Sequence, residues 1–139
     1  MSKGPEVIII DDDRCTLELS KMTVRSVIPE AEIRGFLSAR AALEYLRNID
    51  PDAPDTDRTK GIIVSDLHMP VVDGFRFLDE FALLPPVLCN RYTIFILSAD
   101  ARFADAKELT KKPNLAGFFS KPLTIKKFAT LLRKVGYSV

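Results

Sequence analysis

Short runs rich in Val, Ile and Phe alternate along the chain with stretches in which apolar residues recur every three or four positions. Runs of about four to eight such residues, bounded by Gly, Pro, Asp or Ser, are typical of β-strands. They occupy residues 6–10, 32–36, 62–65, 92–97 and 116–119. The pattern therefore predicts five strands.

Helical spacing separates these runs. Four apolar stripes follow a helical period and are expected to face the core: Cys15, Leu19, Met22; Ala39, Ala42, Leu43, Leu46; Phe77, Phe81, Leu84; and Ile125, Phe128, Ala129, Leu132. Pro29 is predicted to end the first helix, and Pro85 and Pro86 to close the third. A further helix is predicted over 101–112, and a long surface loop over 50–60.

Strands and helices in strict alternation predict an α/β fold, in which a doubly wound parallel sheet is covered on both faces and the crossovers are right-handed. The chain has 139 residues, the usual size of one domain. It contains no internal repeat and no Ser- or Gly-rich linker, and its last helix runs almost to Val139. We therefore expect a single domain over 1–139 with no second domain.

Composition and charge exclude several classes of protein. The net charge of +1 gives no electrostatic basis for binding nucleic acid directly. The first apolar stretch, residues 7–10, is too short for a signal peptide or a membrane span, so a cytoplasmic location is expected. Cys15 and Cys89 have no partner at metal-ligand spacing and are interpreted as small buried hydrophobic residues.

Polar residues collect where the predicted strands end. They are Asp11, Asp12, Asp13, Asp66, Ser98 and Lys121. Because ligands bind beyond the carboxyl ends of parallel strands, these side chains are expected to form one site. Clustered carboxylates suit a hard cation such as Mg²⁺, and a lysine and a hydroxyl suit the oxygens of a phosphoryl group.

Several short motifs, in this order and spacing, resemble one known family. They are Ile8-Ile9-Ile10-Asp11-Asp12-Asp13, Ser65-Asp66-Leu67-His68-Met69-Pro70 with Asp73-Gly74, Leu97-Ser98-Ala99, and Ser120-Lys121-Pro122 with Leu123-Thr124. Over nearly its whole length the chain resembles the receiver domains of two-component response regulators, of the chemotaxis-regulator type. The resemblance implies a flavodoxin-like (βα)5 fold with strand order 2-1-3-4-5.

The resemblance also implies roles for individual residues. Asp66 would be the phosphoacceptor, whose carboxylate attacks a phosphohistidine of a sensor histidine kinase or a histidine phosphotransfer protein. Asp12 and Asp66 would ligate Mg²⁺ directly and Asp11 mainly through water. The main-chain carbonyl of His68 would complete the protein's share of the coordination shell. The domain would catalyse its own phosphorylation and dephosphorylation and no other reaction.

Further roles implied by the resemblance concern the phosphoryl group and the signal. Lys121, the Ser98 hydroxyl and the Ala99 amide would stabilise the phosphoryl oxygens. Movement of Ser98 toward the phosphoryl group would let Phe118 turn inward and change a surface that binds a downstream target protein. His68 and Asp100 would flank the hydrolytic water and set the lifetime of the signal.

Simpler interpretations stand beside these roles. The acidic run suits a helix start with Asp13 as the N-cap, Phe118 suits core packing, and Lys121-Pro122 is ordinary loop sequence. Without the resemblance a trans bond is expected there; the family implies a cis bond.

Two other classes of protein share part of this pattern with a switching receiver. A phosphatase of the haloacid dehalogenase type would need a second Asp at position 68, where this chain has His. A flavodoxin-like FMN carrier would need a phosphate-binding loop where this chain has three aspartates. The alternative that stays open is a phosphorelay intermediate or phosphate sink without its own target; the kinase, the target and the oligomeric state, monomer or homodimer, also stay open.

Overall fold

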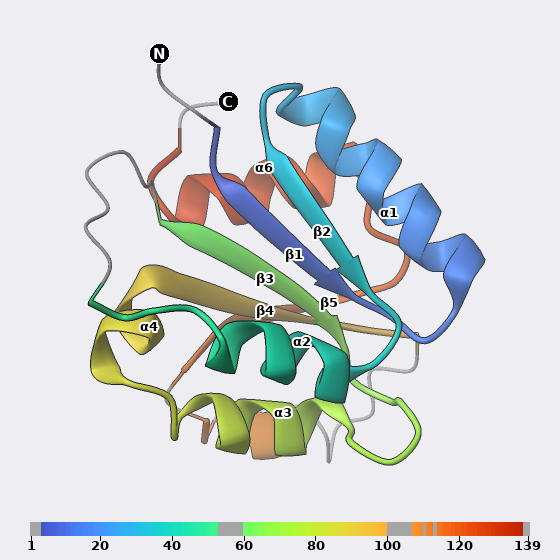
Figure 1. The fold of residues 1–139 in the computed structure, drawn as a ribbon. Helices are drawn as coiled ribbons and strands as arrows, with labels where there is room; N and C mark the ends of the chain where they lie inside the picture. Colours follow the sequence, from blue (N-terminus) through green and yellow to red (C-terminus); the bar gives the residue numbers. More distant parts are fainter. Residues whose placement is uncertain (1–3, 53–59, 100–106, 110, 113, 138–139) are drawn as a thin grey trace.

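The protein contains a parallel sheet of five strands in the order β2-β1-β3-β4-β5 (Figure 1). The computed structural model describes residues 4–52, 60–99, 107–109, 111–112 and 114–137. The strands are β1 (Glu6–Ile10), β2 (Glu32–Phe36), β3 (Gly61–Asp66), β4 (Tyr92–Ser98) and β5 (Leu115–Ser120). The predicted doubly wound α/β fold with order 2-1-3-4-5 is therefore confirmed.

Helices cover both faces of the sheet (Figure 1). They are α1 (Arg14–Val27), α2 (Ala39–Arg47), α3 (Gly74–Phe81), α4 (Pro86–Arg91) and α6 (Ile125–Lys134). α1 packs against α6 on one face and α2 against α3 on the other. Each face accordingly has its own apolar core, one with side chains of α1 and α6 and one with side chains of α2, α3 and α4.

Pairing between strands extends them slightly beyond the apolar runs. β3 and β4 are almost wholly buried, as expected for central parallel strands covered on both faces. The ladder continues to the pairs Asp66 with Leu97 and Ser98 with Ser120. Asp66 and Ser98 are thus the last residues of their strands, where the sequence placed them.

The prediction of which face of α1 packs against the core is wrong. The predicted stripe, Cys15, Leu19 and Met22, is exposed, whereas Leu17, Ser20 and Val24 are buried. Leu19 and Met22 are 63% and 61% exposed. The helix carries two apolar stripes of similar period, and the phase at which the chain leaves β1 decides which one faces the sheet. The interpretation of Cys15 as a buried residue fails for the same reason, while Cys89 is half-buried.

The other helices agree more closely with prediction. The whole predicted stripe of α2 is buried, and α1 ends at Val27, ahead of Pro29. In α6, Phe128 and Leu132 are buried, but Ile125 at its start is 59% exposed.

The segment after α3 departs from the prediction. α3 ends at Phe81, and Leu84 is buried beyond its end. Pro86 does not close α3 but begins the short helix α4, because proline is well suited to a first helical turn.

Two predicted segments fall largely outside the described residues. Of the predicted 101–112 helix, residues 107–109 are described and are helical, whereas residues 111–112 are described and are not helical. Most of the predicted 50–60 loop is not described.

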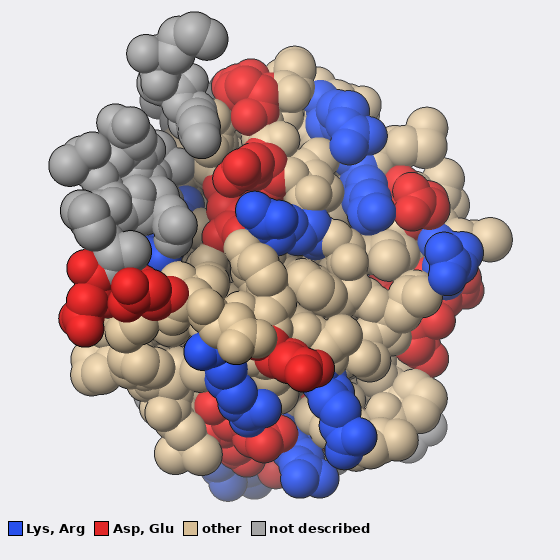
Figure 2. All heavy atoms as spheres, viewed as in Figure 1, with Lys and Arg blue, Asp and Glu red and all other residues tan. Residues whose placement is uncertain are grey.

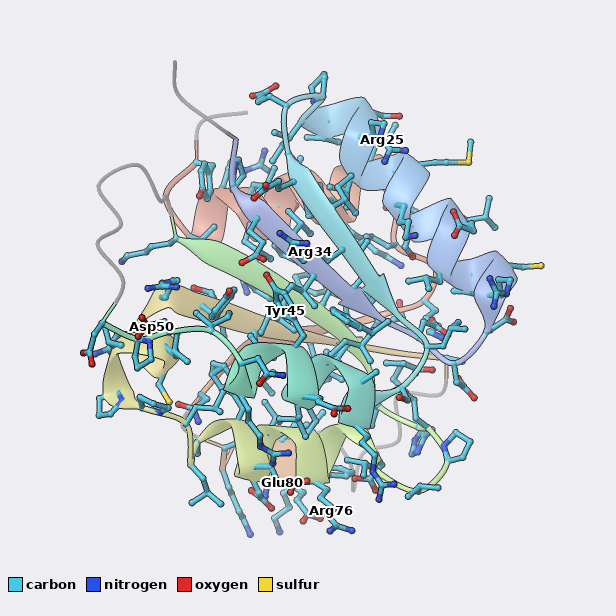
Figure 3. All side chains as sticks on the ribbon, in the orientation of Figure 1. Arg25, Arg34, Tyr45, Asp50, Arg76 and Glu80 are labelled. Atoms are coloured by element: carbon cyan, nitrogen blue, oxygen red, sulfur yellow. The ribbon has the colours of Figure 1, made fainter. Side chains whose placement is uncertain are left out.

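At the amino ends of the strands, one half-buried carboxylate joins four elements. Glu6 accepts hydrogen bonds from Tyr45, Tyr92 and Arg34. The Arg34 guanidinium also lies 5.0 Å from the centre of the Tyr45 ring, and both are labelled in Figure 3. Burial raises the pKa of Glu6, but these three donors outweigh it and hold the pKa below its ordinary value. The network ties β1, β2, α2 and β4 together at the edge opposite Asp66.

Charges of both signs are interspersed on the face seen in Figure 2, which fits the near-zero net charge. None of the helices in the described part of the chain is long and apolar enough to span a bilayer.

Candidate phosphoacceptor site

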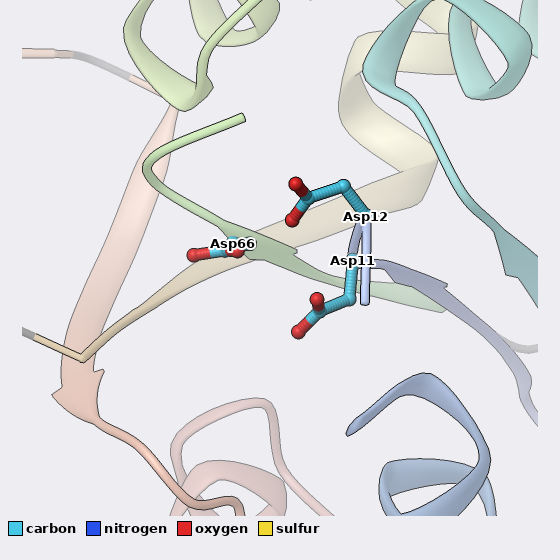
Figure 4. Close-up of side chains that lie close together, drawn as sticks. All are labelled: Asp11, Asp12 and Asp66. Carbon is cyan, nitrogen blue, oxygen red and sulfur yellow. The ribbon is translucent and has the colours of Figure 1, made fainter. Parts of the chain in front are cut away.

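The ends of β1 and β3 bring three carboxylates together (Figure 4). Ile10 pairs with Ser65, so the next residue of each strand, Asp11 and Asp66, lies at the same edge of the sheet. One ligand oxygen from each of Asp11, Asp12 and Asp66 lies within 4.8 Å of the others. Asp11 and Asp66 are buried, and Asp12 is exposed.

Lys121 is the cation of this cluster. Its Nζ lies 2.7 Å from Asp11 Oδ2 and 3.1 Å from Asp66 Oδ2. Desolvation lowers the pKa of Lys121, but the hydrogen bonds and charges of the two carboxylates outweigh it and raise the pKa above its ordinary value. The Lys121 main-chain N–H donates to the Ser98 carbonyl at 2.9 Å, and the Lys121–Pro122 bond is cis, as the family resemblance implies.

Burial dominates the electrostatics of Asp66, whose exposure is 7%. It raises the pKa of the Asp66 carboxyl above its usual range. Lys121 and a hydrogen bond from the His68 amide act in the opposite direction, and the charge of Asp11 adds to the rise. The site therefore holds an incompletely neutralised carboxylate, which favours a further cation.

Asp13 has a structural role as the N-cap of α1. Its Oδ1 accepts hydrogen bonds from the main-chain N–H groups of Cys15 and Thr16, at 2.9 and 3.3 Å, and so caps α1. Its own N–H donates to Asp11 Oδ1 at 2.9 Å. The simpler interpretation of this residue is thus confirmed, and the cap also holds the side chain of Asp11 in place.

The remaining predicted site residues lie at the same edge or just behind it. Ser98 is 2% exposed at the end of β4, and Ala99 and His68 are exposed on the loops that follow β4 and β3. Phe118 pairs in register with Ile96 and packs, partly buried, against the core on the α2 and α3 face. Asp100 lies outside the described residues.

The loop from β3 to α3 has features that the sequence did not indicate. Val71 has a φ of 68° and is 80% exposed, although the left-handed region is unfavourable for a β-branched residue. The Val72 N–H closes this tight turn on the Pro70 carbonyl at 2.8 Å. At the loop's end Gly74 packs so closely that a Cβ would lie 2.9 Å from the Leu67 Cα.

A cavity of about 290 Å³ adjoins this loop and the acidic cluster. Asp12 lines it together with Leu37 of the loop after β2, Arg40 in the first turn of α2, and Met69 and Val71 of the loop after β3. No pattern in the sequence predicted it, because its walls come from three separate segments.

The family model for the response regulator receiver domain matches residues 7–133. The chain belongs to the response regulator receiver family. The receiver shares 27% identity with a response regulator receiver protein of Dyadobacter fermentans, whose crystal structure superposes with a TM-score of 0.82 over 96% of this chain and 100% of that one. Members of this family act in two-component signalling.

Two curated relatives are much longer proteins. The receiver is 30% identical over 90 residues to the two-component response regulator ORR26 of Oryza sativa subsp. japonica. It is 34% identical over 95 residues to the C4-dicarboxylate transport transcriptional regulatory protein DctD of Rhizobium meliloti. Each match covers 63% of this chain but 14% and 17% of the respective relative.

Proposed function

We propose that this receiver accepts a phosphoryl group on Asp66, in a Mg²⁺-dependent reaction, from a phosphohistidine of a sensor histidine kinase or a histidine phosphotransfer protein. One observation carries the proposal. The Asp66 carboxylate is held 3.1 Å from the Lys121 ammonium in a cluster with two further carboxylates. A nucleophile, a metal-binding group and a cation for the phosphoryl oxygens thus share one small volume. The cytoplasm is the location that this proposal implies.

The donor set fits Mg²⁺. Three carboxylates carry three negative charges, and Lys121 supplies one positive charge, so a divalent ion would complete the neutralisation. Oxygen ligands that leave room for water and phosphate are those that Mg²⁺ prefers. Asp12 and Asp66 would bind it directly, Asp11 mainly through water, and the His68 carbonyl would add one ligand. When bound, the ion would offset the charge of the phosphoryl oxygens.

The transfer itself requires a nucleophile and stabilisation of charge. An Asp66 oxygen forms the new P–O bond while the P–N bond to the donor histidine breaks, and the imidazole leaves with the electron pair. Lys121, the Ser98 hydroxyl and the Ala99 amide stabilise the three phosphoryl oxygens. Because Asp66 is buried, these groups act where water screens them little.

The exposed stripe of α1 supports a protein donor. Apolar side chains gathered on a surface mark sites of protein contact, and Leu19 and Met22 are both more exposed than buried. The Thr23 hydroxyl lies 3.4 Å from the Leu123 carbonyl, so this part of α1 adjoins the loop that carries Lys121. A donor seated on the stripe would have its histidine close to Asp66.

The signal would leave through Ser98 and Phe118. Drawing the Ser98 hydroxyl toward a phosphoryl group opens space beside β4 for Phe118, whose ring is partly buried. This shifts an existing equilibrium of the surface around β5 and α6, where a downstream target protein would bind. Identical NMR shifts of β5 and α6 with and without the phosphoryl group would favour a relay or phosphate-sink function instead.

Acetyl phosphate with Mg²⁺, followed by intact mass measurement, tests the proposal. A single phosphoryl adduct is expected in the wild type and none in Asp66→Asn. Asp13→Asn is the matched control, since it removes a neighbouring carboxylate while Asn still caps a helix, and it should keep the adduct. An adduct that survives in Asp66→Asn, or one that forms equally well in excess chelator, would refute the assignment.

A further inference from the structure

The turn that carries Lys121 is held by a second lysine. Lys127 Nζ donates to the Ser120 carbonyl at 2.8 Å, to the Ser120 hydroxyl at 3.2 Å and to the Pro122 carbonyl at 3.2 Å. Its acceptors therefore belong to the residues immediately before and after Lys121. An ammonium group has three N–H donors, and this turn engages all of them.

Lys127 is itself anchored to a rigid element. It lies in the first turn of α6, where its main-chain N–H donates to the Thr124 hydroxyl at 3.1 Å and completes the N-cap. The next residue, Phe128, is completely buried in the core beneath α1 and α6. The hydrogen bonds thus connect the Lys121 turn to the packed interior of the domain.

The position of Lys127 runs against ordinary helix electrostatics. The start of a helix carries partial positive charge, so a lysine there is unfavourable, and the first turn of α6 contains no acidic residue. The three carbonyl and hydroxyl contacts offset this cost locally. A lysine with no such contacts would be expected to extend into solvent.

The position of the Lys121 ammonium matters because it makes two kinds of contact. Its ammonium now bridges Asp11 and Asp66, and during transfer it must meet a phosphoryl oxygen at the same edge. A lysine side chain is flexible, so the backbone from which it reaches has to be fixed. A misplacement of about 1 Å can cost about 100-fold in rate.

We propose that Lys127 is a positioning residue for phosphoryl transfer, which fixes the main chain on both sides of Lys121 and so aims its ammonium at the phosphoryl group. The inference rests on the proposed function of Asp66. It concerns the rate of transfer and not the binding of Mg²⁺, since Lys127 contacts none of the three carboxylates in the hydrogen bonds described.

The test compares three variants with acetyl phosphate as donor, at saturating Mg²⁺ and over a range of donor concentrations. Lys127→Gln should lower the maximal phosphorylation rate about tenfold and leave the Mg²⁺ concentration for half-maximal rate unchanged. Lys126→Gln removes the same charge from the same helical turn and should behave as wild type. Lys127→Arg keeps several N–H donors and should recover most of the rate.

Each result decides between the explanations. Equal rates in Lys127→Gln and Lys126→Gln, or a shift in the Mg²⁺ requirement alone, would overturn the inference while the phosphoacceptor role of Asp66 stands. A wild type that takes up no phosphoryl group would overturn both. If Lys127→Gln is not folded by circular dichroism, Ser120→Ala carries the test: it removes one acceptor and should lower the maximal rate two- to threefold, and an unchanged rate would count against the inference.

Discussion

Replacing Asp66 by Asn should stabilise the metal-free domain, because the site places three carboxylates close together and no metal ion offsets their repulsion. Two unit charges no more than 4.8 Å apart repel each other by about 3.5 kcal/mol or more at an effective dielectric constant of about 20. Asp66 faces two such carboxylates, although the exposed Asp12 is screened more strongly. The Lys121 ammonium, 3.1 Å from the Asp66 carboxylate, attracts it by about 5 kcal/mol at the same dielectric constant. Repulsion and desolvation together therefore exceed the attraction of Lys121, and the ionised Asp66 destabilises the metal-free domain by about 1–2 kcal/mol.

The pH dependence has a definite sign. Burial raises the pKa of Asp66 in the folded state, so the folded protein binds more protons than the unfolded chain between the two pKa values. Stability from this group is accordingly lost as pH rises from about 4 through the folded pKa. The advantage of Asp66→Asn should be absent at lower pH, grow through that window and reach its full value above the folded pKa of Asp66.

Urea unfolding of the wild type and Asp66→Asn, in chelator and at several pH values, measures the difference. Saturating Mg²⁺ should make the wild type more stable than Asp66→Asn. An ion at 100 times its dissociation constant stabilises the wild type by about 2.7 kcal/mol, and it should stabilise the variant by less. If Asp66→Asn proves less stable than the wild type in chelator at neutral pH, the attraction of Lys121 outweighs the repulsion and the reasoning fails.

Two other substitutions test separate features. Val71→Gly relieves a left-handed backbone at an exposed position. The relieved strain of about 1–3 kcal/mol, less the conformational entropy cost of glycine, should raise the free energy of unfolding by about 1 kcal/mol. A lower midpoint in thermal unfolding would contradict this expectation. Leu19→Glu should slow phosphotransfer from a phosphorylated histidine phosphotransfer domain at least tenfold while leaving the acetyl phosphate rate unchanged. Parallel loss with both donors would show that the exposed stripe of α1 is not a docking surface.

The sequence by itself determined the fold and the edge at which the site lies. Alternating apolar runs and helical stripes specify a parallel sheet, and strand ends collect at one edge of such a sheet whatever the details of packing. The gathering of Asp11, Asp12 and Asp66 with Lys121 follows from that rule, since each residue ends or follows a strand. Local chemistry also sufficed for Asp13, because an N-cap depends on its own helix alone.

Tertiary structure decided everything that depends on how separate segments meet. Leu19 and Met22 share a helix with Leu17 and Val24, and the periodicity of α1 is compatible with either stripe facing the core. The phase at which the chain leaves β1 and packs α1 against the sheet and α6 decided between them. The pKa of Asp66 depends on burial by neighbours distant in sequence. The Lys127 contacts likewise need the turn after β5 to fold back on α6, which no periodicity in the chain encodes.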